Sequence, residues 1–247
     1  MTDVIGHRAN IGIIVPSSNT VVGPECDSPR PYGVTNHIGR VTIKPVSLAD
    51  PSAYREHVER MRQGILGAVD QIMTAPLDHL IMGVAIETFW GGYEKAEAFR
   101  AELAAHAGVG VSFGSQALVN GLRTFGCKNI AVLTPHQPQG DDVVRQYFEE
   151  AGFSVKRLIG LKCDKPKDIA QVPLRTLVDS VKALDGDDVD AVVQVGTGLS
   201  MLRVAAACEL FLDKPVMSIN GYTYWEALRS LGINDRFEHL GRMFSHH

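Results

Sequence analysis

The chain has 247 residues, of which 45% are hydrophobic and 21% charged, a balance typical of a folded globular protein. The formal net charge is −4 at pH 7 and no run of Lys or Arg occurs, which argues against nucleic-acid binding. The longest apolar stretches are far shorter than the ~20 residues of a membrane helix, and residues 1–10 lack a signal-peptide pattern, so we expect a cytoplasmic protein without membrane contact.

The first half alternates strand-sized apolar runs with helix-sized amphipathic segments. Strands are predicted at 11–16, 40–46, 79–86 and 109–113, and helices at 52–74, 93–107 and 116–126. The run at 11–16 is closed by a proline, and the helix at 116–126 is closed by a glycine.

The second half repeats this order of elements. Strands are predicted at 129–135, 153–161, 189–196 and 214–220, and helices at 141–152, 175–184, 199–211 and 223–232. Strands separated by helices indicate βαβ units with mainly parallel pairing. The repeated order predicts an internal structural duplication, although the two halves share little sequence.

The predicted fold is therefore α/β, with two pseudo-symmetric lobes that each hold a mainly parallel sheet flanked by helices. We assign residues 1–117 together with 221–247 to the first lobe and residues 118–220 to the second. The last helix is expected to return and pack on the first lobe. Because ligands bind at the carboxyl ends of parallel strands, the site is expected in the cleft between the lobes.

Four segments at predicted strand ends combine small residues, hydroxyl groups and backbone amides: 16–20, 83–92, 134–136 and 196–200. Turns of this kind suit carboxylate or oxyanion binding, although each alone is most often a helix cap. No G-x-G-x-x-G or Walker A pattern follows any predicted strand. The four cysteines, Cys26, Cys127, Cys163 and Cys208, match no zinc spacing and fit a reducing compartment.

These strand-end segments resemble a known group of enzymes. PSSNTVVGPE (16–25), MG (82–83), TPH (134–136), VQVGTGLS (193–200) and KPVMSINGYTYWEALR (214–229) resemble the Asp/Glu racemase superfamily. The branch they resemble most contains maleate cis-trans isomerase and arylmalonate decarboxylase. The resemblance implies a two-lobed α/β fold, a small carboxylate substrate, no cofactor or metal, and a homodimer or higher homo-oligomer.

The resemblance also identifies what this chain lacks. Racemases and maleate isomerases of this group hold the substrate between two cysteines, and arylmalonate decarboxylase keeps the second of them. The matching positions here are Gly83 and Gly196, and none of the four cysteines lies at a predicted strand end. The thiolate chemistry of the family is therefore not expected in this chain.

Two other side chains are the candidate catalytic residues. Glu87 follows a strand that should enter the cleft, and its neighbours Phe89 and Trp90 should raise its pKa towards the range of a general base. His136 takes the place where the family often has a substrate-binding tyrosine, and an imidazole can donate a hydrogen bond or move a proton. The candidate substrate-binding residues are Ser17, Asn19, Gly83, Thr88, Trp90, Thr134, Gly196, Thr197 and Gly198.

Three functions follow from this set. The first is a cofactor-independent enzyme that moves a proton beside a carboxylate, in a decarboxylation or isomerisation without cysteine. The second is a hydrolase in which Glu87 activates water against a small amide or lactone, in room opened by the two glycines. The third is a carboxylate-binding protein without activity. Racemisation is disfavoured because it needs a base on each face of the substrate.

Overall fold

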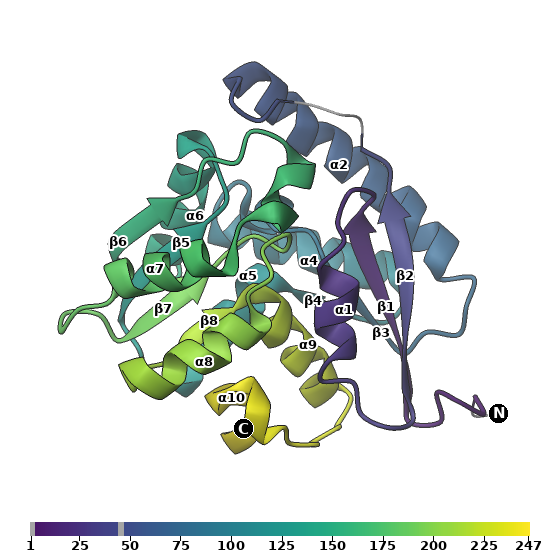
Figure 1. Ribbon diagram of the computed structural model, residues 1–247. Coiled ribbons are helices and arrows are strands. Elements are labelled where there is room, and N and C mark those ends of the chain that lie inside the picture. The colour runs from purple at the N-terminus through teal and green to yellow at the C-terminus, as the bar shows by residue number, and fades with distance from the viewer. Residues whose placement is uncertain (1–2, 44–46) are drawn as a thin grey trace.

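The computed structural model describes residues 3–43 and 47–247, which form two four-stranded sheets (Figure 1). The first sheet has the order β2-β1-β3-β4 and the second has the order β6-β5-β7-β8. Every pair of neighbouring strands is parallel, so the predicted fold class is confirmed. The strands are β1 (Ala9–Pro16), β2 (Val34–Val41), β3 (His79–Met82), β4 (Gly110–Phe113), β5 (Asn129–Thr134), β6 (Ser154–Gly160), β7 (Ala191–Gln194) and β8 (Val216–Ser218).

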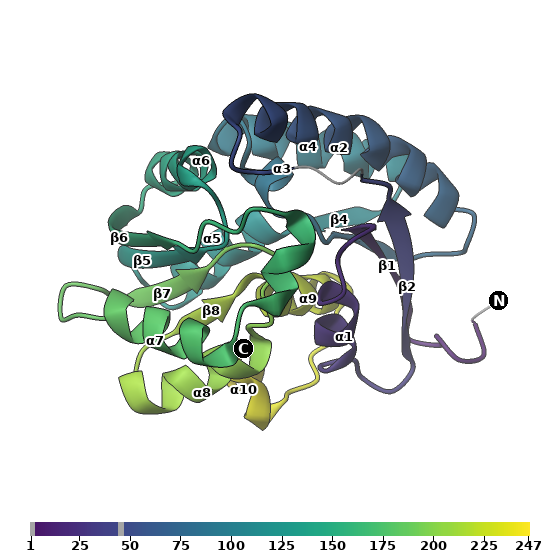
Figure 2. The same cartoon turned by 45° about the horizontal axis from the view of Figure 1, so that its top comes forward.

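Helices connect these strands and cover both sheets, as Figures 1 and 2 show. The first half contains α1 (Val22–Asp27), α2 (Pro51–Ile72), α3 (Ile86–Phe89), α4 (Tyr93–Ala107) and α5 (Gly114–Thr124). The second half contains α6 (Pro138–Glu150), η1 (Pro166–Gln171), α7 (Leu174–Leu184) and α8 (Leu202–Leu212). The chain closes with α9 (Ile219–Ser230), η2 (Glu238–Leu240) and α10 (Arg242–His246).

The strand predicted at 40–46 was wrong. The strand of this region is β2, which pairs with β1 from Ala9 opposite Val34 to Pro16 opposite Val41. As an edge strand it carries half-buried polar residues, such as Asn36 and His37, that hide its pattern, while its buried ends, Val34 and Val41, anchor it. Residues 42 and 43 are irregular, and residues 44–46 of the predicted strand lie outside the described residues.

Two other predicted strands are shorter than expected because helices begin within them. The segment predicted as strand 79–86 leaves the sheet after Met82 and enters α3 at Ile86. The segment predicted as strand 214–220 ends at Ser218, whose side chain caps α9 by accepting a hydrogen bond from the Gly221 amide. The early end of β3 leaves a short turn, residues 83–85, at the carboxyl edge of the first sheet, whereas α9 follows β8 directly.

The two halves share a continuous core. Phe89 of α3 packs against Tyr147 and Phe148 of α6, with ring centroids 4.8 and 5.7 Å apart. Phe89 is fully buried, and burial of aromatic side chains on this scale dominates core energetics. This contact holds α3, which follows β3, against α6 of the second half.

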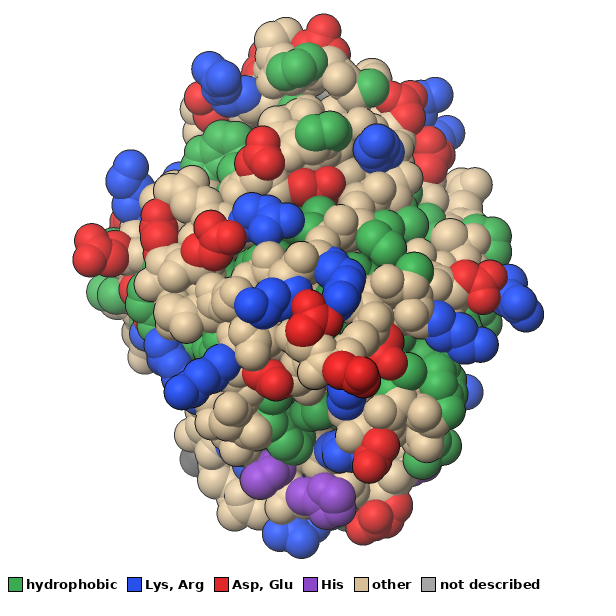
Figure 3. Space-filling view, turned by 90° about the vertical axis from the view of Figure 1, so that its left-hand side faces the viewer, with side chains coloured by type: hydrophobic (Ala, Val, Ile, Leu, Met, Phe, Trp, Pro, Cys, Tyr) green, Lys and Arg blue, Asp and Glu red, His purple; other side chains and the backbone are tan. Residues whose placement is uncertain are grey.

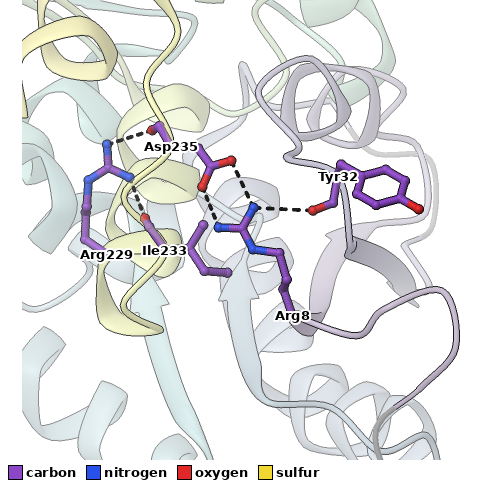
Figure 4. A network of polar contacts seen from close by, with 5 residues as sticks. All are labelled: Arg8, Tyr32, Arg229, Ile233 and Asp235. Carbon is purple, nitrogen blue, oxygen red and sulfur yellow. Dashed lines mark hydrogen bonds and ion pairs between the residues drawn. The ribbon is translucent and has the colours of Figure 1, made fainter.

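The last long helix returns to the first sheet, as expected. Tyr224 and Leu228 of α9 share a buried cluster with Ile11 and Ile13 of β1. The loop that follows is held by a bidentate pair between Arg8 and Asp235, in which Nη1 of Arg8 lies 2.9 Å from Oδ1 (Figure 4). The start of β1 and the C-terminal segment are therefore joined by both apolar and ionic contacts.

The surface mixes charges of both signs. Figure 3 shows the face where β6 and α7 lie, with Lys and Arg side chains interspersed among Asp and Glu. Among the described residues, no helix combines the length and the apolar character required to cross a membrane.

Candidate active site

A cavity of about 670 Å³, counting its open mouth, lies at the carboxyl ends of four strands. It is lined by the turns that follow β1, β3, β5 and β7. These are the two inner strands of each sheet. These lining residues are Pro16, Ser18, Asn19, Thr20, Ala85, Ile86, Glu87, Pro135, His136, Gly196, Thr197 and Gly198. The expected position of the site, between the two sheets, is where the cavity lies.

The opposite wall comes from α2, from η1 and from the chain between β2 and α2. It is formed by Tyr54, His57 and Met61 of α2 together with Ile43, Leu48, Pro166, Ile169 and Ala170. In Figures 1 and 2 the segment with η1 (green) lies between the second sheet and α1, close to the strand ends. Apart from Tyr54 and His57, this wall is apolar.

Six of the predicted site residues line the cavity: Asn19, Glu87, His136, Gly196, Thr197 and Gly198. The other five, Ser17, Gly83, Thr88, Trp90 and Thr134, do not line it. Trp90 ends α3 and packs against the core between the halves. Sequence pattern located the right turns, but it did not show which side chains of each turn face inward.

The hydroxyl groups of Ser17, Thr88 and Thr134 are engaged with the protein itself. Ser17 Oγ accepts a hydrogen bond from the Ile43 amide at 3.0 Å, and Thr88 Oγ1 donates to the Ala85 carbonyl at 2.7 Å. Thr134 Oγ1 donates to Asp141 and accepts from the His136 amide. These hydroxyls therefore help to shape the turns, and the three residues do not line the cavity.

Glu87 is the buried acid of the cavity. It lies in the first turn of α3, with 4% of its surface exposed, and burial raises its pKa from 4.5 to about 7. The hydrogen bond from its own amide and the charge of Arg62 lower this pKa less than burial raises it. The direction expected from the sequence is confirmed, and both protonation states are accessible near neutral pH.

His136 lies on the second side of the cavity as a neutral imidazole. It is buried, and desolvation lowers its pKa to about 4. Its Nε2 atom is buried and has no hydrogen-bond partner among the described residues. At neutral pH the His136 imidazole is therefore uncharged, and one of its two ring nitrogens can accept a hydrogen bond.

Two cavity residues were missed by the sequence analysis, Tyr54 and His57. Positions three and four apart share one face of a helix, so Tyr54, His57 and Met61 form one stripe of α2. The helix at 52–74 was predicted from the sequence, but Tyr54 was assigned no role in the site. Burial, followed by the charge of Arg60, lowers the pKa of His57. The sequence signal that could have identified them is the polar atoms of Tyr54 and His57 on an otherwise apolar face of the helix.

The loop at Gly196–Gly198 lines the cavity. Within the described part of the chain, the amides of Gly196, Thr197 and Gly198 donate no hydrogen bond, whereas Leu199 N–H donates to the Gly196 carbonyl. Backbone amides without a protein acceptor beside a cavity are candidate donors to a carboxylate or an enediolate.

Side chains from both halves hold this loop in place. Asn220 Nδ2 donates to the Thr197 carbonyl at 3.0 Å and to Glu25 Oε2 at 2.8 Å, and Glu25 also accepts from the Leu202 amide. Asn19 Nδ2 lies 3.4 Å from Thr197 Oγ1, while its oxygen accepts hydrogen bonds from the Val21 and Val22 amides at the start of α1. Asn19 therefore acts mainly on the loop geometry.

The two glycines at the expected thiol positions have no space for a side chain in the present backbone. A Cβ atom on Gly83 would lie 2.9 Å from the Ile14 carbonyl oxygen and 2.8 Å from a methyl group of Val15. Gly196 has φ +108°, and a Cβ atom there would lie 2.4 Å from Cδ of Pro135. The extra room for water expected at these glycines is therefore absent.

The four cysteines lie away from the cavity. Cys26, Cys127 and Cys208 are buried, Cys163 is half-buried, all four thiols are free, and none of them lines the cavity. Burial raises the pKa of Cys26, so its thiol is held in the unreactive protonated form. Within residues 3–43 and 47–247, no three His, Cys, Asp or Glu side chains are arranged to hold a metal ion.

Comparison with known proteins gives a consistent group of relatives. The family model "Arylmalonate decarboxylase" matches residues 11–244. A maleate isomerase of Geobacillus stearothermophilus is 28% identical over 249 residues, covering 95% of this chain and 96% of that protein.

Two solved structures show the same fold. The maleate isomerase of Pseudomonas putida S16 superposes with a TM-score of 0.88 at 23% identity, over 96% of this chain and 98% of that one. A Cys→Ser variant of Nocardia farcinica maleate cis-trans isomerase, with a covalently bound succinylcysteine intermediate, has a TM-score of 0.82 at 23% identity, over 91% and 93% of the two chains.

Proposed function

Because the chain belongs to the arylmalonate decarboxylase family, we propose that it is an enzyme that moves a proton at the carbon beside a carboxylate of a small substrate. The observation that carries this proposal is Glu87, a buried carboxyl group that lines the cavity and has a pKa raised to about 7. A group with this pKa can both give and take a proton at neutral pH. The step needs no cofactor.

A decarboxylation illustrates the roles of the cavity residues. The carboxylate that stays on the substrate binds to the free amides of Gly196–Gly198. The bond to the second carboxylate breaks, CO₂ leaves, and the electron pair remains on the carbon as an enediolate, which the amides stabilise. Neutral Glu87 then donates its proton to that carbon, and solvent returns a proton to Glu87.

In this proposal the Glu87 carboxyl group replaces the cysteine thiol that reacts with the substrate in a relative. The Nocardia farcinica isomerase variant carries a succinylcysteine intermediate, so a cysteine reacts with the substrate there. No cysteine lines the cavity of the present chain, and the Cβ positions of Gly83 and Gly196 are occupied by neighbouring atoms. A carboxyl acid–base group is consistent with such a cavity.

Hydrolysis by Glu87-activated water is the second candidate function. The observation that favours it is the pair of uncharged polar groups, Tyr54 and His136, which suit an amide or lactone better than a second carboxylate. In that reaction, water adds to the acyl carbon, its proton passes to Glu87, and Glu87 returns the proton to the leaving group.

A panel of small malonates, unsaturated dicarboxylates and their amides tests these proposals. Proton NMR in D₂O detects deuterium at carbon, while separate assays detect CO₂ and ammonia. CO₂ release or deuterium at carbon supports proton transfer beside a carboxylate, and ammonia release supports hydrolysis. Glu87→Gln is expected to lower turnover about 100-fold or more while substrate binding persists.

The matched control is Glu226→Gln. Burial also raises the pKa of Glu226 to about 7, but this side chain lies outside the cavity, so its substitution is expected to leave turnover unchanged. Unchanged turnover in Glu87→Gln would reject Glu87 as the acid–base group. Binding without turnover of any substrate would instead identify a carboxylate-binding protein.

A further inference from the structure

Two buried polar atoms of the cavity wall lack hydrogen-bond partners. The Tyr54 hydroxyl and His136 Nε2 are both buried, and neither pairs with a protein group among the described residues. Both residues line the cavity. A buried polar group without a partner is destabilising, so such groups in native proteins generally point to a ligand or a bound water.

The two groups are close neighbours. Both pack on Gly140 at the start of α6, where a Cβ atom would lie 2.4 Å from the Tyr54 oxygen and 2.8 Å from Cβ of His136. Tyr54 comes from α2 and His136 from the turn after β5, so the pair joins the two halves of the molecule. We call Tyr54 and His136 the neutral pair.

The surroundings of the neutral pair do not favour a negative charge. None of the described residues that line the cavity is Lys or Arg. His136 is neutral because burial lowers its pKa to about 4, and Glu87, on the same cavity, carries negative charge above pH 7. A second substrate carboxylate placed here would be desolvated without a compensating cation.

We propose that the neutral pair binds a primary carboxamide, and that the substrate is the half-amide of a small dicarboxylic acid. Its carboxylate occupies the amides of Gly196–Gly198, and its carboxamide faces Tyr54 and His136. This inference rests on the proposed function for the carboxylate end. It departs from the decarboxylation described above, which needs a second carboxylate, and deepens the hydrolysis, whose amide it places at Tyr54 and His136.

A carboxamide suits the neutral pair because it both donates and accepts. A neutral imidazole donates from one nitrogen and accepts at the other, and a tyrosine hydroxyl can do either. The N–H and C=O groups of a carboxamide can therefore pair with both residues in either histidine tautomer. A carboxylate of the same shape only accepts and adds a charge.

Calorimetric titration with succinamate and succinate, at pH 8, tests this inference. These two probes have the same size and differ in one group, a carboxamide or a carboxylate. We expect succinamate to bind about tenfold more tightly or better, and we expect Tyr54→Phe and His136→Phe to abolish that preference. Tyr147→Phe is the control, since the Tyr147 hydroxyl is also buried and unpartnered but lies outside the cavity.

The same titration in Glu87→Gln separates this inference from the proposed function. Turnover does not enter this comparison, and the charge of Glu87 is removed. A preference for succinamate that persists there supports the neutral pair, whatever reaction the protein catalyses. Equal affinities or tighter binding of succinate would overturn the inference. So would a preference for succinamate that disappears in Glu87→Gln, or one that survives in Tyr54→Phe and His136→Phe.

Discussion

Replacing Glu87 by glutamine is expected to stabilise the protein at alkaline pH while removing its activity. The carboxyl group is buried, and its pKa is about 7 in the folded protein against an ordinary value of 4.5. The folded state therefore holds a proton that the unfolded state releases between these two values. Stability is lost as pH rises from 4.5 to 7, and the loss is complete above pH 7.

The size of the effect follows from the pKa difference. A shift from 4.5 to about 7 corresponds to about 3 kcal/mol of destabilisation of the wild-type protein above pH 7. Glutamine does not ionise, so the variant escapes this loss. For a chain of this size, about 3 kcal/mol raises the melting temperature by about 6–12 °C.

Urea unfolding of both proteins at pH 4 and pH 8.5 measures this difference. We expect the advantage of Glu87→Gln to grow by up to about 3 kcal/mol between the two pH values. Glu102→Gln, on an exposed position of α4, serves as the surface control and should show no such growth. An equal difference at both pH values would show that the pKa of Glu87 is not raised, and would remove the basis for its role.

Further predictions concern the loop at Gly196. Gly196→Ala is expected to destabilise the fold by about 1–3 kcal/mol in thermal unfolding, because φ is +108° and a proline ring occupies the Cβ position. Gly67→Ala, in open space on α2, should instead stabilise by about 1 kcal/mol, and similar melting temperatures for the two variants would contradict this account. Asn220→Ala removes the bridge between Glu25 and Thr197, so KM should rise at least severalfold with the circular dichroism spectrum unchanged; an unaltered KM would show that the bridge does not position the loop.

The sequence predicted the architecture because its apolar strands are strongly marked. The buried run of β1 and the repeated strand–helix order both follow from hydrophobic periodicity, which depends on burial alone. The edge strand β2 was misplaced because half-buried polar residues, such as Asn36 and His37, interrupt its apolar pattern, and because its pairing is set by β1, a contact outside its own sequence. Whether a strand lies at the edge or in the middle of a sheet determines its pattern of apolar and polar residues, and the local sequence does not indicate that position.

The candidate site was predicted in part for a similar reason. Strand ends identified the four turns, and the sign of the Glu87 pKa followed from its apolar neighbours. The inward or outward direction of each hydroxyl depends on tertiary hydrogen bonds, such as that from the Ile43 amide to Ser17. Tyr54 and His57 were missed because α2 reaches the cavity through packing of the whole helix on the first sheet.

The central claim is that a carboxyl group moves the substrate proton in a cavity without a thiol. Incorporation of deuterium from D₂O into the substrate carbon, followed by proton NMR, tests it most directly in wild type, Glu87→Gln and Cys163→Ser, since Cys163 is the one cysteine that is not fully buried. Our account predicts a loss of about 100-fold or more in Glu87→Gln and an unchanged rate in Cys163→Ser. An unchanged rate in Glu87→Gln with a loss in Cys163→Ser would contradict it.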